Sequence, residues 1–105
     1  MNILMIDTSG PACGVAIMAD GRLVYEAELT HRQTHSQRVM PMVDTALQMS
    51  DMTAADMDVF GAVVGPGSFT GVRIGVSTVK ALAHASGKSC VAVDALEALA
   101  AKLGT

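Results

Sequence analysis

The chain has 105 residues, a net charge of −3 at pH 7, 50% hydrophobic residues and 16% charged residues. This length suits one domain, and the apolar content excludes an intrinsically disordered polypeptide. The slight acidity, without a run of Lys or Arg, argues against this domain gripping a nucleic-acid backbone by itself. No stretch approaches the roughly 18 to 20 apolar residues that cross a bilayer, and the start lacks the basic region of a targeting segment. We therefore expect a cytoplasmic protein with no membrane partner.

Three short strands are predicted at the beginning of the chain. Residues 3–6 form a continuous apolar run, which fits a strand buried on both faces. Residues 14–18 predict a second strand, and the following Asp20-Gly21 is a strong hairpin signal. Apolar and polar side chains alternate over residues 23–29, which predicts a strand with one solvent-exposed face at a sheet edge. The second and third strands should be antiparallel.

Helices and strands then alternate. Residues 36–50 change to a helical period, with an apolar stripe that Met40 and Met49 widen: Val39, Met42, Val43, Ala46 and Leu47. Pro41 fits best in a first turn, so this helix should begin near Val39 or Met40. Further along we expect a short helix or turn at 53–56, a buried strand at 59–64, a helix at 72–86 closed by Gly87, a strand at 90–93 and a helix at 95–103.

The order of these elements predicts an α/β fold. Strand 59–64, helix 72–86 and strand 90–93 form a βαβ unit, so the two strands should be parallel. Combined with the opening hairpin, this predicts a mixed five-stranded sheet, three strands antiparallel and two parallel, with flanking helices. Because the chain stops directly after its last predicted helix, we expect an N-terminal half whose second half is missing or separate.

Two turns could face a phosphate. The glycine-rich loop 65–71 joins a strand to a helix N-terminus, whose free N–H groups can cradle an anion. Its spacing is neither a Walker A loop nor a dinucleotide fingerprint, and it could equally be a tight connection without a ligand. Asp7 ends the first strand and could hold a phosphate-bound metal, or merely form an Asx turn. The candidate residues are Asp7, Thr8, Ser9, Gly65, Gly67, Ser68 and Gly71.

The histidines and cysteines predict no metal site. His31 and His35 have the i, i+4 spacing that can bind a metal on a helix. They precede the predicted helix, however, and have no acidic third ligand nearby, so we expect solvated loop residues. Cys13 and Cys90 each lie in or beside an apolar strand without a neighbouring His or a CxxC partner, which predicts buried structural thiols.

The two long helices carry more apolar and small residues than one small sheet needs. In the second helix Gly71 and Gly75 are one turn apart, and Thr78, Ala81 and Ala85 continue a strip of small residues. Small residues let another helix approach closely. The pattern leaves two interpretations open: a surface for a partner helix, or ordinary packing on the sheet and between the helices.

Three motifs resemble the TsaB family, also called YeaZ. They are Ile6-Asp7-Thr8-Ser9, His35-Ser36-Gln37-Arg38 through Pro41, and above all GPGSFTGVRIG at residues 65–75. The resemblance implies the actin-like, sugar-kinase and Hsp70-type fold (ASKHA, ribonuclease H-like). It also implies that residues 1–105 are a single N-terminal half-domain, without the C-terminal domain that family members normally carry.

The resemblance also implies a function. TsaB is a non-catalytic dimerisation subunit that helps make threonylcarbamoyladenosine beside the anticodon of tRNA. It pairs with the transferase TsaD, while the ATPase TsaE binds their complex; tRNA is reached only through that complex, and a homodimer is the other pairing. No cofactor is expected to bind tightly, although ATP could sit at a complex interface. The implied partner surface lies on the two helices: Val39, Met40, Met42, Val43, Ala46, Leu47, Val72, Arg73, Gly75, Val76, Val79 and Ala83.

Two other functions remain as alternatives. The first is a nucleotide-binding ASKHA-type enzyme that uses Asp7 and the loop 65–71, and ATP binding would distinguish it. The second is a glycoprotease-like metallopeptidase, which would need a metal held through His31 and His35. No activated Ser or Cys supports proteolysis.

Overall fold

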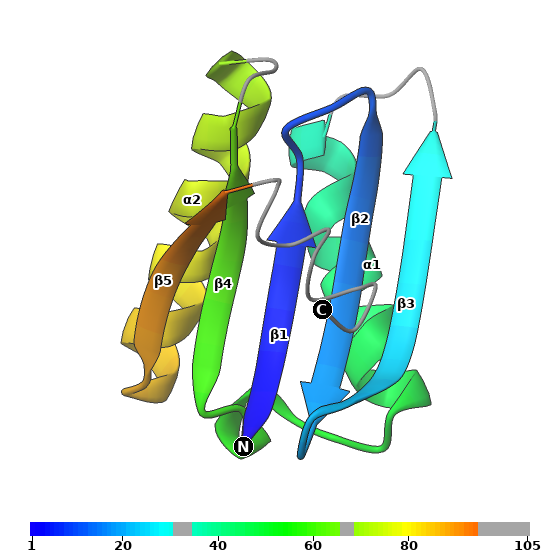
Figure 1. Ribbon diagram of the computed structural model, residues 1–105, viewed down its shortest axis with the longest axis vertical. Helices are drawn as coiled ribbons and strands as arrows, with labels where there is room; N and C mark the ends of the chain where they lie inside the picture. Colours follow the sequence, from blue (N-terminus) through cyan, green and yellow to red (C-terminus); the bar gives the residue numbers. More distant parts are fainter. Residues whose placement is uncertain (31–34, 66–68, 95–105) are drawn as a thin grey trace.

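A computed structural model describes residues 1–30, 35–65 and 69–94. Strands β1 and β2 are antiparallel, as are β2 and β3, whereas β1, β4 and β5 run parallel to one another. The sheet order is β3-β2-β1-β4-β5 (Figure 1). This confirms the predicted mixed five-stranded sheet. The elements are β1 (Asn2–Asp7), β2 (Ala12–Ala19), β3 (Arg22–Thr30), α1 (His35–Met49), the short helix η1 (Ala54–Asp56), β4 (Val59–Val64), α2 (Phe69–Ser86) and β5 (Ser89–Asp94).

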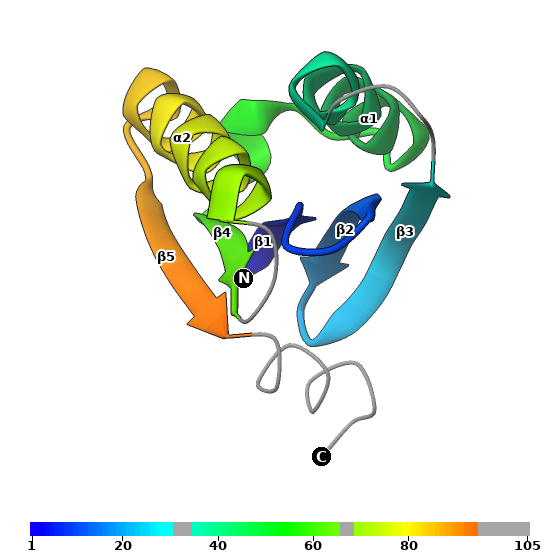
Figure 2. The same cartoon turned by 90° about the horizontal axis from the view of Figure 1, so that it is seen from above.

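Both helices pack on the same face of the sheet, and Figure 2 shows them side by side above it. The core lies between this face and the helices. Leu4, Ile6 and Phe60 are fully buried strand residues within it. The opposite face of the sheet carries neither α1 nor α2. The helix predicted at 95–103 lies outside the described residues, so the flanking helices that the structure describes all belong to one layer.

The β2–β3 turn forms as its sequence predicts. Asp20 and Gly21 both have positive φ, at 53° and 78°, which matches a type I′ hairpin turn. Beyond the turn, the register shifts between Ile17 and Met18, which pair with Tyr25 and Leu23. This bulge bends the strands beside the hairpin. Strand β3 comes first in the sheet order, so it lies at the edge of the sheet, as its alternating pattern indicated.

Helix α1 begins earlier than predicted. It starts at His35, so Pro41 lies in the helix interior and not in its first turn. An interior proline costs about 3 kcal/mol, because it removes one helix hydrogen bond and crowds a carbonyl. Burial of Val39 and Val43 offsets this cost at about 1.5–3 kcal/mol each. Tertiary packing therefore extends the helix through a residue that locally disfavours it.

Helix α2 also begins earlier than predicted, at Phe69 and not at Val72. Its C-terminal end agrees with the prediction. Gly87 has a φ of 67°, the N–H of Lys88 donates to the carbonyl of Ala83, and the N–H of Gly87 donates to that of His84. This is a Schellman motif, in which glycine adopts the left-handed conformation that ends the helix.

Candidate partner-binding groove and phosphate-facing turns

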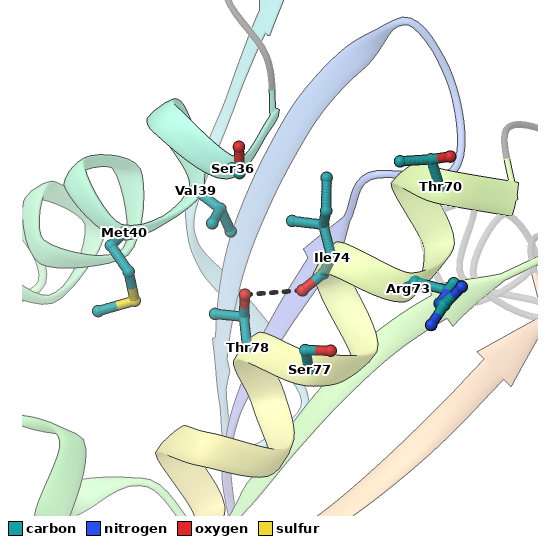
Figure 3. Close-up of a pocket in the computed structure, with 8 residues that line it drawn as sticks. All are labelled: Ser36, Val39, Met40, Thr70, Arg73, Ile74, Ser77 and Thr78. Carbon is teal, nitrogen blue, oxygen red and sulfur yellow. Dashed lines mark hydrogen bonds between the residues drawn. The ribbon is translucent and has the colours of Figure 1, made fainter.

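A groove of about 430 Å³ lies between α1 and α2. Val39 and Met40 face it from α1, and Ile74 and Thr78 face it from α2 (Figure 3). The hydroxyl of Thr78 donates to the carbonyl of Ile74 at 2.7 Å, so it needs no acceptor from a partner. The groove is lined by Ser36, Val39, Met40, Thr70, Arg73, Ile74, Ser77 and Thr78.

The charged residue among those that line the groove is Arg73, which lies at the edge of the groove. Figure 3 shows Arg73 extending from the side of α2 away from Met40. Met40 is 40% exposed, and Ser36 and Ser77 are exposed small residues. The space between the helices therefore combines an apolar floor with small walls, which allows another helix to approach closely.

The helix residues implied as a partner surface divide into two groups. Six of them are buried in the domain's own core and have little accessible surface, although Val39 still lines the floor of the groove: Val39, Val43, Ala46, Gly75, Val79 and Ala83. The other six are exposed or half-buried: Met40, Met42, Leu47, Val72, Arg73 and Val76. Contacts to another chain can therefore come only from the second group and from the residues that line the groove.

Five groove residues are absent from the partner surface that the resemblance implied: the apolar Ile74 and four polar residues. Ser36, Thr70, Ser77 and Thr78 are polar and fall outside an apolar stripe. A signal for the α2 members does exist, because Thr70, Ile74 and Ser77 repeat at one-turn spacing on one face of the helix. The implied partner surface consists mostly of apolar residues, whereas the groove is lined partly by small hydroxyl residues.

The Asp7–Ser9 turn at the end of β1 is engaged within the domain. The carboxylate Oδ1 of Asp7 accepts hydrogen bonds from the Ser9 backbone N at 3.0 Å and the Ser9 hydroxyl at 2.6 Å. These bonds form the Asx turn that was the simpler of the two interpretations of this motif. Asp7 is exposed, and Ser9 is half-buried.

Thr8 joins this turn to α2. Its side chain is fully buried, and its hydroxyl donates to the carbonyl of Gly71 in the first turn of the helix. A Cβ added at Gly75 would lie 2.6 Å from the Thr8 hydroxyl oxygen, which is closer than real Cβ contacts. Thr8 therefore contributes to the attachment of α2 to the sheet. Gly65 is half-buried at the end of β4, and Gly67 and Ser68 lie outside the described residues.

The two cysteines differ in burial. Cys13 is buried as predicted, and desolvation, with the nearby charge of Asp7, raises the pKa of its thiol. Cys90 is exposed, so the prediction of a buried thiol there is wrong. It lies on β5, an edge strand that contacts α2 much less than its neighbour β4 does. An apolar sequence pattern did not reveal this incomplete cover.

His35 is the first residue of α1 and does not belong to a loop, whereas His31 lies outside the described residues. The metal-binding potential of the pair is therefore untested. Within residues 1–30, 35–65 and 69–94, no group of three or more His, Cys, Asp or Glu side chains could hold a metal ion. In the same residues no helix is long and apolar enough to cross a membrane.

Solved structures place this geometry among known folds. The chain is similar to YeaZ from Pseudomonas aeruginosa, with a TM-score of 0.82 and 35% identity over 89% of this chain and 43% of that one. It also resembles Thermus thermophilus RuvC in complex with a Holliday junction, with a TM-score of 0.60, 14% identity and coverage of 91% and 66%. The RuvC likeness shows the fold alone, which is ribonuclease H-like.

Sequence comparisons give the family. The model of the tRNA N6-adenosine threonylcarbamoyltransferase family, TsaD, matches residues 28–104. The threonylcarbamoyladenosine biosynthesis protein TsaB of Bacillus subtilis is 41% identical over 101 residues, which are 96% of this chain and 44% of the relative. The Escherichia coli TsaB is 40% identical over 100 residues, which are 95% of this chain and 43% of the relative. The chain thus spans less than half the length of these relatives. It belongs to the TsaB (YeaZ) family and corresponds to the N-terminal, Gcp-like domain of that family.

Proposed function

We propose that this chain is a non-catalytic dimerisation subunit in the formation of threonylcarbamoyladenosine in tRNA, and that it pairs with a TsaD-like transferase. The relatives that it matches are named threonylcarbamoyladenosine biosynthesis proteins. The observation that carries the pairing is the groove between α1 and α2. A TsaE-like ATPase and the tRNA would then act on the assembled pair.

The groove has the chemistry of a helix-docking surface. Val39 forms a buried apolar floor, and Met40 offers a flexible side chain that adapts to a partner's shape. Ser36 and Ser77 are small enough to let a partner backbone come close. A second copy of the chain could use the same groove, so a homodimer and the pair with the transferase would exclude each other.

The turn at the end of β1 supports a non-catalytic role. Asp7 holds its own turn through Ser9, and Thr8 is committed to the carbonyl of Gly71. A nucleotide site built on these groups would need the Thr8 hydroxyl to give up its buried hydrogen bond to the carbonyl of Gly71. We therefore favour the partner role over nucleotide chemistry.

A pair of matched variants tests the groove. Met40 lies in it and is 40% exposed, whereas Met49 lies outside it on the same helix and is 72% exposed. We expect Met40→Glu to weaken binding to the TsaD-like transferase of the same organism by about tenfold or more, because a carboxylate would be desolvated in the interface. Met49→Glu should bind like the unsubstituted chain. Isothermal titration calorimetry measures both.

Three results would count against this function. Unchanged binding by Met40→Glu would remove the groove from the interface, and no binding by the folded, unsubstituted chain would remove the pairing itself. Circular dichroism of both variants confirms that they fold. A rise in melting temperature with ATP that Asp7→Asn abolishes would instead support the nucleotide-binding alternative.

A further inference from the structure

Strand β3 lies at the free edge of the sheet, beside a second groove. Within the described residues its only partner strand is β2 (Figure 1). An edge strand presents a row of backbone N–H and C=O groups to which an extended chain can add. A groove of about 200 Å³ runs along this edge, lined by Tyr25, Ala27 and Leu29 of β3 and by Arg38, Pro41, Met42 and Thr45 of α1.

Arg38 gives this groove a chemical preference. Its Nε is buried and has no hydrogen-bond partner among the residues that the structure describes. A buried donor on a cation without an acceptor is costly, and a carboxylate matches the planar guanidinium best because it can accept two parallel hydrogen bonds.

The position of Arg38 in α1 strengthens this preference. Arg38 lies in the first turn of the helix, where the helix dipole already contributes positive potential, and no acidic residue occupies that turn. The two sources of positive potential add at one end of the groove. An anionic group bound there would be attracted both by the Arg38 guanidinium and by the helix dipole.

We propose that the β3 edge binds an extended peptide segment of another protein, which adds a strand to the sheet. On its α1-facing side the segment would carry an Asp or Glu that pairs with Arg38 and, two residues away, an apolar side chain that enters the groove. The period of a strand places both of these side chains on one face. This inference does not depend on the proposed pairing with a transferase, which uses the other side of α1.

A second copy of this chain fits the edge poorly. A symmetric antiparallel pair of β3 strands centred on Ala27 would place Glu26 of one copy opposite Glu28 of the other, and like charges in direct opposition destabilise a sheet. The residues of β3 that line the groove, Tyr25, Ala27 and Leu29, include no carboxylate for Arg38. An unrelated segment with alternating composition satisfies both faces.

A designed peptide tests this surface. The probe is Thr-Val-Lys-Asp-Lys-Val-Thr, which sets Val, Asp and Val on one face and Lys toward Glu26 and Glu28 on the other; the matched probe replaces Asp by Asn. In an NMR titration of the full 15N-labelled chain, we expect shifts at the amides of residues 25–29 and at the Arg38 Nε–H. The Asn peptide should bind about tenfold or more weakly.

Matched protein variants complete the test. The Arg38→Gln variant should bind both peptides equally. Arg22 is an exposed arginine of β3 outside the groove, and the Arg22→Gln variant should keep the preference for the Asp peptide. No binding, shifts elsewhere, equal affinity for the two probes, or a preference that survives Arg38→Gln would each overturn the proposal. Met40→Glu should leave peptide binding unchanged, which separates this site from the groove between the helices.

Discussion

Helices α1 and α2 each have an inner face, which packs on the sheet, and an outer face, which borders the groove between the helices. The two faces carry similar residues in the sequence but have different roles in the structure. On the inner faces, Val43 and Ala46 are fully buried, and Val79 is 2% exposed. On the outer faces Met40 is 40% exposed and lines a groove. Apolar residues occupy both, because a helix with a wide stripe can cover a sheet and still present apolar surface. The apolar stripe of a helix therefore does not by itself mark a partner interface.

The inner faces are also closely fitted. Gly75 brings the backbone of α2 against Thr8, Ile6 and Ala62, and any larger residue meets those atoms. The outer groove has no such constraint. Substitutions should accordingly have large effects on stability in the inner set and small effects in the outer set. The first two of the following predictions test the inner set, and the third gives a small effect at a turn outside both helices for comparison.

The largest effect is expected for Val43→Asp. Val43 is fully buried within the cluster of apolar core residues, so the new carboxylate would be desolvated there. The cost should be about 4 kcal/mol or more, comparable with the total stability of many domains. Urea unfolding followed by circular dichroism measures it. Gln37→Asp, at an exposed position near the start of the same helix, is the control and should be neutral or slightly stabilising. If Val43→Asp unfolds cooperatively at the same urea concentration as the unsubstituted chain, the assignment of Val43 to the buried inner face would be wrong.

An intermediate effect is expected for Gly75→Ala. Alanine favours a helix over glycine by about 1 kcal/mol, but its Cβ would press on the Thr8 hydroxyl, so a net loss of about 1–2 kcal/mol should result. Thr8→Ala alone should also destabilise, because it removes the buried hydrogen bond from the Thr8 hydroxyl to the carbonyl of Gly71.

A double-mutant cycle isolates the contact between Gly75 and Thr8. In the Thr8→Ala background, Gly75→Ala should become neutral or stabilising, because the obstructing oxygen is gone. Free energies of unfolding from urea titrations provide all four corners of the cycle. Strict additivity would show that the steric contact does not limit the approach of α2.

The smallest effect is expected away from both helix faces, for Asp20→Asn. The Met1 ammonium donates to Asp20 Oδ1 at 2.8 Å, which raises the pKa of the ammonium from its ordinary 8.0 and lowers that of Asp20 from 3.8. Asn tolerates the positive φ of this turn position, so the turn should survive.

The sign of the pH dependence follows from the two shifts. The ion pair should contribute to the free energy of unfolding between about pH 4 and pH 8. This contribution should be lost as pH falls through the lowered pKa of Asp20, and also as pH rises through the raised pKa of the Met1 ammonium. Melting temperatures of the two proteins should differ slightly within that window and converge outside it, and high salt should reduce the difference. A constant difference across the whole pH range would contradict the ion pair.

The local elements of the fold could be predicted from the sequence. The predicted strand 59–64 has the bounds of β4, the Asp20-Gly21 turn forms, and Gly87 ends α2. Each depends on interactions within a few residues: backbone conformation at glycine, the alternation of a strand, or a short connection. The parallel pairing of β4 and β5 follows from the same local evidence, because a helix between two strands leaves little choice of direction.

Residues with identical local signals could not be separated. Cys13 and Cys90 both lie in apolar strands, but Cys13 is buried on the inner strand β2 and Cys90 is exposed on the edge strand β5. The sequence likewise does not reveal that α1 starts ahead of Pro41 or that Gly75 is buried against Thr8. Nor does it reveal that the buried Nε of Arg38 has no hydrogen-bond partner among the described residues. The amino-acid order by itself determined which segments are strands and helices and how the chain turns between them. Only the tertiary structure decided which apolar residues fill the core and which line the grooves, because burial depends on what packs from distant parts of the chain.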